Sequence, residues 1–124
     1  MKKLNGILVV NSFIGLEKFT ELYRMLLDAA GKNDVSLKIR TTASLLSPVG
    51  ELFTDEPIPD FVLFWDKDVY LASRLENAGI RLFNSAKAVE LCDNKALTAI
   101  NLSKAGVKIP KTVIAPKTFD GVGY

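Results

Sequence analysis

The sequence predicts an α/β fold, a three-layer sandwich in which helices cover a mainly parallel, Rossmann-like sheet of about five strands. Short apolar runs typical of buried strands alternate with segments of helical period. The chain of 124 residues has the length of one domain, and its 48% hydrophobic and 24% charged residues are ordinary for a globular protein. Because strands that alternate with helices are joined by right-handed crossovers, the sheet is expected to be parallel.

Five segments have the character of strands. Residues 7–10 (ILVV) and 61–65 (FVLFW) are continuous apolar runs, as expected of strands covered on both faces. Residues 35–41 (VSLKIRT) alternate apolar and polar side chains, which predicts a half-exposed strand at an edge. Residues 80–84 (IRLFN) and 111–115 (KTVIA) complete the predicted sheet.

Apolar residues at 3.6-residue spacing fill most of the remaining chain. The helices are predicted at residues 16–30, 68–78, 85–91 and 94–105. Gly31, Gly79 and Gly106 are the predicted stops of the first, second and last helix, and Asp93 is the predicted N-cap of the last one.

The remaining segments are expected to be structural. Residues 43–60 contain three prolines and are interpreted as a surface excursion between the second and third strands. Trp65 and Phe83 end two apolar runs and are expected in the core. Cys92 is expected to be a small, semi-buried apolar residue.

The composition excludes several kinds of chemistry. The chain contains no histidine, so it holds no Ser-His or Cys-His catalytic pair and no His-ligated metal. Its single cysteine excludes an internal disulfide. A net charge of +2 does not indicate a nucleic-acid partner, and no run approaches the ~18 apolar residues of a membrane span. We expect a cytoplasmic protein with no nucleic-acid or membrane partner and no metal site or catalytic residue of its own.

Functional residues of parallel α/β sheets usually follow the carboxyl ends of the strands. Here these positions hold Asn11 and Ser12, then residues 66–68 (DKD), then Asn84. Asn11 and Ser12 are candidates for binding a substrate carboxylate, with closure of the first turn as the alternative role. The first turn lacks the glycines of a dinucleotide fingerprint or a P-loop.

The segment from Gly79 to Thr112 (GIRLFNSAKAVELCDNKALTAINLSKAGVKIPKT) carries a family resemblance. A strand that ends in Asn84 is followed by a short helix, by Lys95 and by the run GVKIPKT at 106–112. This order resembles the ATP-grasp ligases, in particular the RimK-like group that attaches amino acids such as glutamate to carboxylates. The sequence departs from the family in having Asn94 before the lysine, where the family usually has Asp.

The resemblance implies a pre-ATP-grasp domain over residues 1–115 and the start of a linker to a C-terminal ATP-grasp module over 116–124. It implies ATP and Mg²⁺ as cofactors of the full-length protein and an acyl-phosphate mechanism that joins a carboxylate to an amine. Lys95 matches the family lysine that reaches the ATP phosphates. Asp66 and Lys67 match the region that lines part of the substrate cleft, with Asp66 or Asp68 as a helix N-cap in the alternative interpretation.

The family's glycine-rich phosphate lid, second nucleotide lysine and acidic Mg²⁺ ligands are not found in this sequence. We therefore expect the N-terminal domain of a longer ligase, inactive by itself and without a tightly bound cofactor. Its expected partners are the C-terminal module and the carboxylate and amine substrates. The resemblance also allows a homo-oligomer, although no apolar stripe identifies an interface.

Two other functions stay open. A receiver domain of a phosphorelay fits the chain length, the position of Asp66 after the third strand and a lysine, Lys111 or Lys117, near the last one. Against it, Asn11 and Ser12 occupy the place of the acidic pair that holds Mg²⁺ in a receiver, and residues 116–124 have no helical period. The other alternative is a non-catalytic binding module with the same fold.

Overall fold

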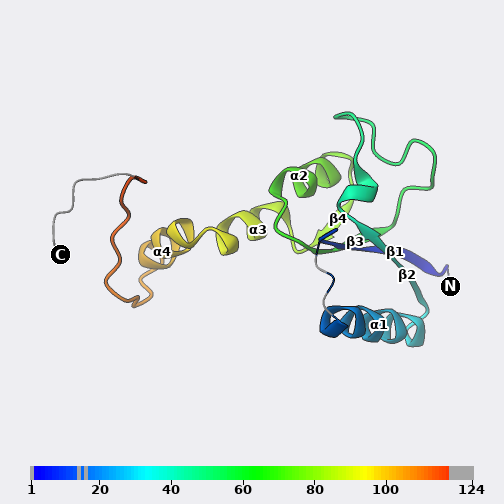
Figure 1. Cartoon of the computed structure of the whole chain (residues 1–124), viewed down its shortest axis with the longest axis horizontal. Helices are drawn as coiled ribbons and strands as arrows, with labels where there is room; N and C mark the ends of the chain where they lie inside the picture. Colours follow the sequence, from blue (N-terminus) through cyan, green and yellow to red (C-terminus); the bar gives the residue numbers. More distant parts are fainter. Residues whose placement is uncertain (1, 14, 16, 118–124) are drawn as a thin grey trace. The chain divides into compact units, whose positions relative to one another are not determined.

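The computed structural model describes residues 2–13, 15 and 17–117 (Figure 1). The chain divides into two compact units, Met1–Val89 and Glu90–Tyr124. The first unit contains the sheet and the second contains the last helix. Residues 118–124, which hold most of the predicted linker, lie outside the described residues.

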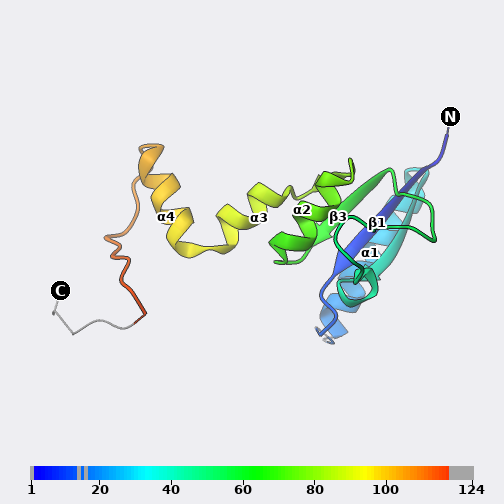
Figure 2. The ribbon, with the colours of Figure 1, turned by 90° about the horizontal axis from the view of Figure 1, so that it is seen from above.

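The sheet has four parallel strands in the order β2-β1-β3-β4. They are β1 (Leu4–Val10), β2 (Val35–Thr41), β3 (Phe61–Trp65) and β4 (Arg81–Phe83). The predicted parallel α/β fold is confirmed, and β2 lies at an edge as predicted. Figure 2 shows β1 and β3 side by side.

The prediction of a fifth strand at residues 111–115 is wrong, because these residues form no strand. A strand needs a hydrogen-bonded neighbour, and this segment has none among the described residues. It also lies between Pro110 and Pro116, neither of which has an N–H to donate to a ladder.

Helices lie on both faces of the sheet (Figure 1). The helix α1 (Glu17–Lys32) follows β1, and α2 (Val69–Asn77) follows β3 on the other face. Because side chains alternate along a strand, β1 supplies both cores. Leu8 and Val10 pack with Tyr23 of α1, whereas Ile7 and Val9 pack with the cluster that includes Leu75 of α2.

Residues 43–60 are more than a surface excursion. They begin with a short 3₁₀ turn, η1 (Ala43–Leu45), in which Leu45 is buried. Leu52 and Phe53 pack against the core on the α2 side of the sheet. Arg40 pairs with Glu56 and also donates to the carbonyl of Ser44 at 3.0 Å, so the segment is tied to β2 at two points. The sequence pattern missed this packing because the segment has neither strand nor helix period.

Of the three glycines predicted to end helices, Gly31 does not end one, because it lies inside α1. The left-handed residue beyond this helix is Asp34, with φ 57°. Aspartate tolerates this conformation better than most residues with a side chain. Gly79 and Gly106 adopt positive φ angles of 83° and 78° and follow α2 and the last helix, as predicted.

Two helices follow the sheet, α3 (Ala86–Asp93) and α4 (Lys95–Lys104). The predicted N-cap of α4 is wrong by one residue. Asp93 is the last residue of α3, and Asn94 caps α4 by accepting hydrogen bonds from the amides of Ala96 and Leu97 at 3.0 and 3.1 Å. Asparagine caps helices as well as aspartate does.

Trp65 and Phe83 are not core residues, since they are 43% and 48% exposed. Both lie on the α1 side of the sheet, where Trp65 contacts Tyr23 and Phe83 contacts Phe61. The helix α1 packs over β1 and β2 and leaves β4 uncovered on this side. Cys92 is exposed rather than semi-buried.

The helix α4 buries none of its residues. Ile100 and Leu102 are exposed, as are Val107, Val113 and Ile114 in the segment that follows. No helix in the described ranges has the length and apolar character needed to cross a bilayer.

The core on the α2 side should depend strongly on Leu75, which is 0% exposed. Leu75→Ala should lower the free energy of unfolding by about 2–5 kcal/mol, because it removes buried methyl groups and leaves a cavity. Urea denaturation followed by circular dichroism measures the change. Met25→Ala on the outer face of α1, where Met25 is 60% exposed, should change the stability by at most about 0.5 kcal/mol. Equal effects of the two substitutions would contradict this core.

Candidate functional site

The candidate site is the carboxyl edge of the sheet. All four strands are parallel, so their carboxyl ends meet at one edge. The chain leaves β1 toward β2 and leaves β3 in the opposite direction toward β4, which makes the boundary between β1 and β3 the topological switch point. Open α/β sheets bind ligands in the crevice at this point. Asn11 follows β1 and Asp66 follows β3, so these two predicted residues flank it.

Asn11 joins the two strands across the switch point. Its Nδ2 donates to Oδ1 of Asp66 at 3.1 Å, and its Oδ1 accepts from the amide of Phe13 at 2.8 Å. The second bond is an Asx turn that closes the chain after β1. Asn11 therefore has the turn-closing role considered in the sequence and, in addition, orients the carboxylate of Asp66.

Ser12 is bound to the end of β2 rather than to Asn11 and Asp66. Its hydroxyl lies 3.1 Å from that of Thr42 and accepts from the amide of Ala43 at 2.8 Å. Thr42 was missed as a site residue, although it follows the second strand and the rule of carboxyl ends identifies it. The edge thus holds two polar pairs, Asn11 with Asp66 and Ser12 with Thr42.

The residues after β3 combine a cap with the site. Oδ2 of Asp66 accepts from the amide of Asp68 at 3.2 Å. Oδ1 of Asp68 accepts from the amide of Leu71 at 2.9 Å, so Asp68 is the N-cap of α2, as the alternative interpretation had it. Lys67 lies between the two carboxylates in the chain and is exposed. Of the two carboxylates in this segment, Asp68 caps α2 and Asp66 does not.

Tyr23 of α1 is a residue of this region that sequence reasoning did not identify. It is buried, and its ring makes an edge-to-face contact with Trp65 at 5.5 Å between centroids. Burial raises the pKa of the Tyr23 hydroxyl, and the negative charge of Asp66 raises it further. No local sequence signal connects Tyr23 with Asp66, because the fold brings them together from separate elements.

A hollow of about 280 Å³ lies beside these residues on the α1 side of the sheet. It is lined by Leu8, Leu26, Leu63, Phe64, Trp65, Phe83 and Asn84. Asn84, which follows β4, supplies an amide to this otherwise apolar lining. The region thus offers an apolar surface next to the polar carboxyl edge.

Lys95 belongs to the second unit, where it is the exposed first residue of α4. Helix N-termini attract anions through their free amides. Here Asn94 already accepts from the amides of Ala96 and Leu97. Lys95 therefore offers a point charge on a flexible side chain rather than part of a backbone anion site.

The geometry gives little support to two other kinds of site. The described residues contain no group of three acidic or cysteine side chains that could hold a metal ion. In a receiver domain Asp66 would face an acidic pair and a lysine on the last strand. Asn11 occupies the first of these places, and Lys111 and Lys117 lie in a segment without strand structure.

No family model matches the chain. The chain is 31% identical over 123 residues to the uncharacterized protein MG012 of Mycoplasma genitalium, which covers 97% of this chain and 42% of that protein. A homolog of MG012 in Mycoplasma pneumoniae is 41% identical over 59 residues, 47% of this chain and 20% of the homolog.

A shorter match connects the chain with an enzyme. It is 38% identical over 47 residues to the glutamate–LysW ligase ArgX of Sulfolobus acidocaldarius, covering 38% of this chain and 17% of the ligase. The chain thus spans about two fifths of MG012 and a smaller share of the other two relatives. Part of this chain is similar to part of a glutamate ligase.

The titration of Tyr23 tests the geometry of the carboxyl edge. In a Tyr70→Phe, Tyr124→Phe background, Asp66→Asn should lower the pKa of Tyr23, because it removes a charge that opposes the phenolate. Ultraviolet absorbance of the phenolate measures the pKa. Asp68→Asn, which keeps a capping side chain, should leave it unchanged. An unaltered Tyr23 titration in Asp66→Asn would contradict the proximity of the two groups.

The raised pKa of Tyr23 also predicts how the free energy of unfolding changes with pH. The ordinary pKa of tyrosine is 10.0, and that of folded Tyr23 is higher, so above pH 10 the folded state holds more protons than the unfolded one. The contribution of Tyr23 is therefore constant below about pH 10 and falls as the pH rises through the folded pKa. Urea denaturation at several pH values should show a smaller alkaline loss in Tyr23→Phe.

Proposed function

We propose that this chain is the N-terminal part of an ATP-dependent carboxylate–amine ligase of the RimK-like ATP-grasp group. The observation that carries the proposal is the 38% identity over 47 residues to a glutamate ligase. The motif order from Asn84 through Lys95 to Thr112, with a helix that begins at Lys95, agrees with it. The relatives are longer than this chain, which agrees with further modules in the whole protein.

The carboxyl edge of the sheet is the proposed substrate surface. Asn11, Ser12, Asp66 and Lys67 are the residues that we assign to it. The hydrogen bond between Asn11 and Asp66 holds both side chains at the switch point, where substrates of open α/β sheets bind. A carboxylate substrate suits the amide of Asn11, the hydroxyl of Ser12 and the ammonium of Lys67, whereas an amine substrate suits Asp66.

Lys95 is the proposed contact to the ATP phosphates. In the proposed reaction the γ-phosphoryl group forms a bond to a carboxylate oxygen of the substrate as the bond to ADP breaks. The amine then attacks the acyl phosphate, loses a proton as the amide bond forms, and expels phosphate. A lysine near the phosphates compensates the negative charge that gathers there. The described residues do not fit a Mg²⁺ site, so the ligands of this cofactor would come from another part of the protein.

The exposed apolar side chains of the second unit support a partner module. Ile100 and Leu102 of α4, with Val113 and Ile114 after it, are exposed in this chain. Apolar surface of this kind is stabilised when another part of a protein covers it. We assign that role to the C-terminal ATP-grasp module. A cytoplasmic location, where ATP is available, is part of the same proposal, and a single unpaired cysteine agrees with it.

A pair of lysine substitutions tests this function in the polypeptide encoded by the complete open reading frame. Lys95→Ala should lower the rate of ATP-dependent ligation about 100-fold or more, because a phosphate-stabilising charge is lost. Lys104→Ala, at the other end of the same helix, removes an equal charge and should change the rate by less than about threefold. ADP release in the presence of candidate carboxylates and amines measures the rate.

Two outcomes would contradict the proposal. An open reading frame that encodes no further lysine, glycine-rich loop or acidic Mg²⁺ ligands would favour a non-catalytic binding module. Equal rates in Lys95→Ala and Lys104→Ala would show that Lys95 does not contact ATP.

A further inference from the structure

On the α1 side of the sheet, α1 packs over β1 and β2, and β4 is not covered by a helix of the described residues. Five side chains of β3 and β4 lie on this side, of which the first two are partly buried against the core under α1; we call the five the open face. They are Phe61, Leu63, Trp65, Arg81 and Phe83. Phe61 and Phe83 make an edge-to-face contact at 6.4 Å between ring centroids, and the Arg81 guanidinium lies 5.2 Å from the centroid of Phe83.

The open face ends at an unpaired strand edge. The last strand, β4, is hydrogen-bonded to β3 on one side and has no strand neighbour on the other among the described residues. An unpaired edge presents free N–H and C=O groups and is a template for pairing with another strand. Natural proteins commonly protect such edges with charged side chains. Here the protective charge, Arg81, lies over the ring of Phe83.

We propose that two copies of this chain associate through β4, which pairs with the second copy's β4 in antiparallel orientation about Leu82. A two-fold axis at Leu82 places Arg81 opposite the second copy's Phe83 and Phe83 opposite the second copy's Arg81. The strand Arg81–Phe83 is therefore complementary to itself. The contact between Arg81 and Phe83 within one chain is repeated twice across the interface.

The pairing also joins the two open faces. A two-fold axis perpendicular to the sheet keeps the α1 side of both copies on one side. Trp65 and Phe83 of each copy then lie on the same side of the joined sheet, and the side chain of Leu82 points to the α2 side, into its own core. Since Leu82 is buried in its own core, the interface is built mainly by Arg81, Phe83 and the backbone of β4.

The opposite edge of the sheet does not favour the same pairing. The middle residue of β2 is Lys38, so antiparallel pairing of two β2 strands about their centre would place two lysines opposite each other. Like charges directly opposite are destabilising in a sheet. The side chain of Arg40, also in β2, is already used by Glu56 and Ser44. The edge formed by β4 is therefore suited to pairing with a second copy about its centre, and the edge formed by β2 is not.

The size of the surface predicts a weak dimer. A large aromatic side chain buries about 150–250 Å² when fully covered, and Trp65 and Phe83 are each roughly half exposed. With the strand edge, one copy contributes well below the ~800 Å² per partner of a standard interface. We expect a dissociation constant of about 10 µM to 1 mM rather than a permanent dimer.

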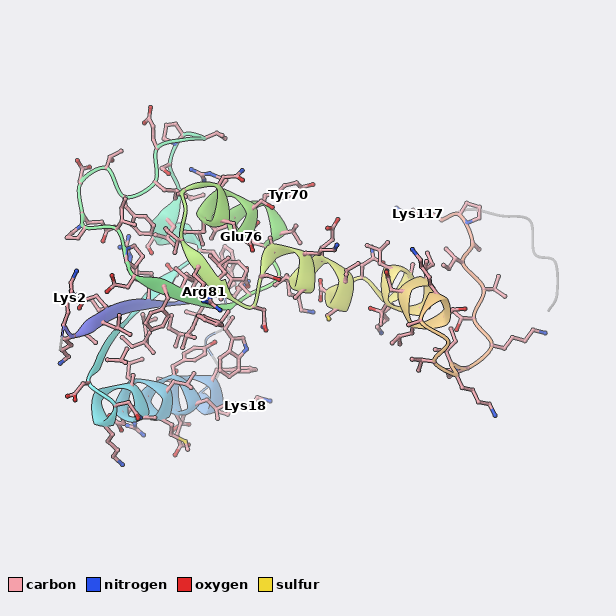
Figure 3. The ribbon with its side chains drawn as sticks, turned by 180° about the vertical axis from the view of Figure 1, so that it is seen from behind. Lys2, Lys18, Tyr70, Glu76, Arg81 and Lys117 are labelled. Atoms are coloured by element: carbon pink, nitrogen blue, oxygen red, sulfur yellow. The ribbon has the colours of Figure 1, made fainter. Side chains whose placement is uncertain are left out.

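Sedimentation equilibrium of the 124-residue chain, from about 10 µM to about 1 mM, tests the association. The apparent mass should rise with concentration from one toward two chains. Phe83→Lys should weaken the association about tenfold or more, because the introduced ammonium group would face the second copy's Arg81. Tyr70→Lys is the matched control, since Tyr70 is an 84% exposed aromatic residue on α2, away from the open face (Figure 3).

A charge reversal tests the register. Arg81→Glu combined with Phe83→Lys places opposite charges across the two-fold axis, so the double variant should restore the association to within about threefold of the original chain. Circular dichroism verifies that each variant is folded. If Phe83→Lys does not fold, Arg81→Glu alone gives the answer, because it removes the cation from the second copy's Phe83 and should weaken the association.

Three results would overturn the inference. An apparent mass of one chain at every concentration would show that β4 does not pair with a second copy. An association that Phe83→Lys does not weaken would belong to another surface. Failure of the double variant to restore the association would exclude the Leu82-centred register. None of these results depends on the proposed ligase function, because the measurement needs no substrate.

Discussion

The burial of β1 on both faces is the constraint on which the rest of the structure depends. This strand pairs in parallel with β2 and with β3, and its side chains alternate between the core under α1 and the core under α2. Parallel strands buried in this way need a crossover helix on each face. The crossover through α1 leads from β1 to β2, and the crossover through α2 leads in the opposite direction from β3 to β4. This divergence creates the switch point where Asn11 and Asp66 meet.

The carboxyl edge is organised by hydrogen bonds among its own side chains. Asn11 orients Asp66, Ser12 is held by Thr42 and the amide of Ala43, and Asp68 is used by α2 as its cap. Polar groups that already have partners keep a fixed geometry and lose little entropy when a ligand arrives. This is the property expected of a substrate surface, and it is also sufficient to close the turns of the fold.

The two faces of the sheet are covered unequally, and this explains where the molecule exposes apolar surface. On the α2 side, residues 43–60 add Leu45, Leu52 and Phe53 to the helix, so the core extends across the sheet. On the α1 side one helix covers β1 and β2 and reaches β3 only in part, so Trp65 and Phe83 stay half exposed. The second unit has exposed apolar side chains of its own, among them Ile100 and Leu102 of α4. Surfaces of this kind are expected in a chain that acts together with other copies or modules.

The sequence by itself determined the fold class, most strand and helix positions, and which polar residues follow the strands, because these depend on local period, on turn residues and on the rule of carboxyl ends. It also determined the family resemblance of the segment around Lys95. Tertiary structure decided what depends on contacts between distant segments. Residues 111–115 have strand composition but no partner among the described residues, and residues 43–60 have no period but pack on the core. Trp65 and Phe83 are apolar but uncovered, and Tyr23 meets Asp66 only through the packing of α1 on the sheet. Burial and strand pairing depend on which residues are neighbours in space, and local sequence patterns do not identify these neighbours.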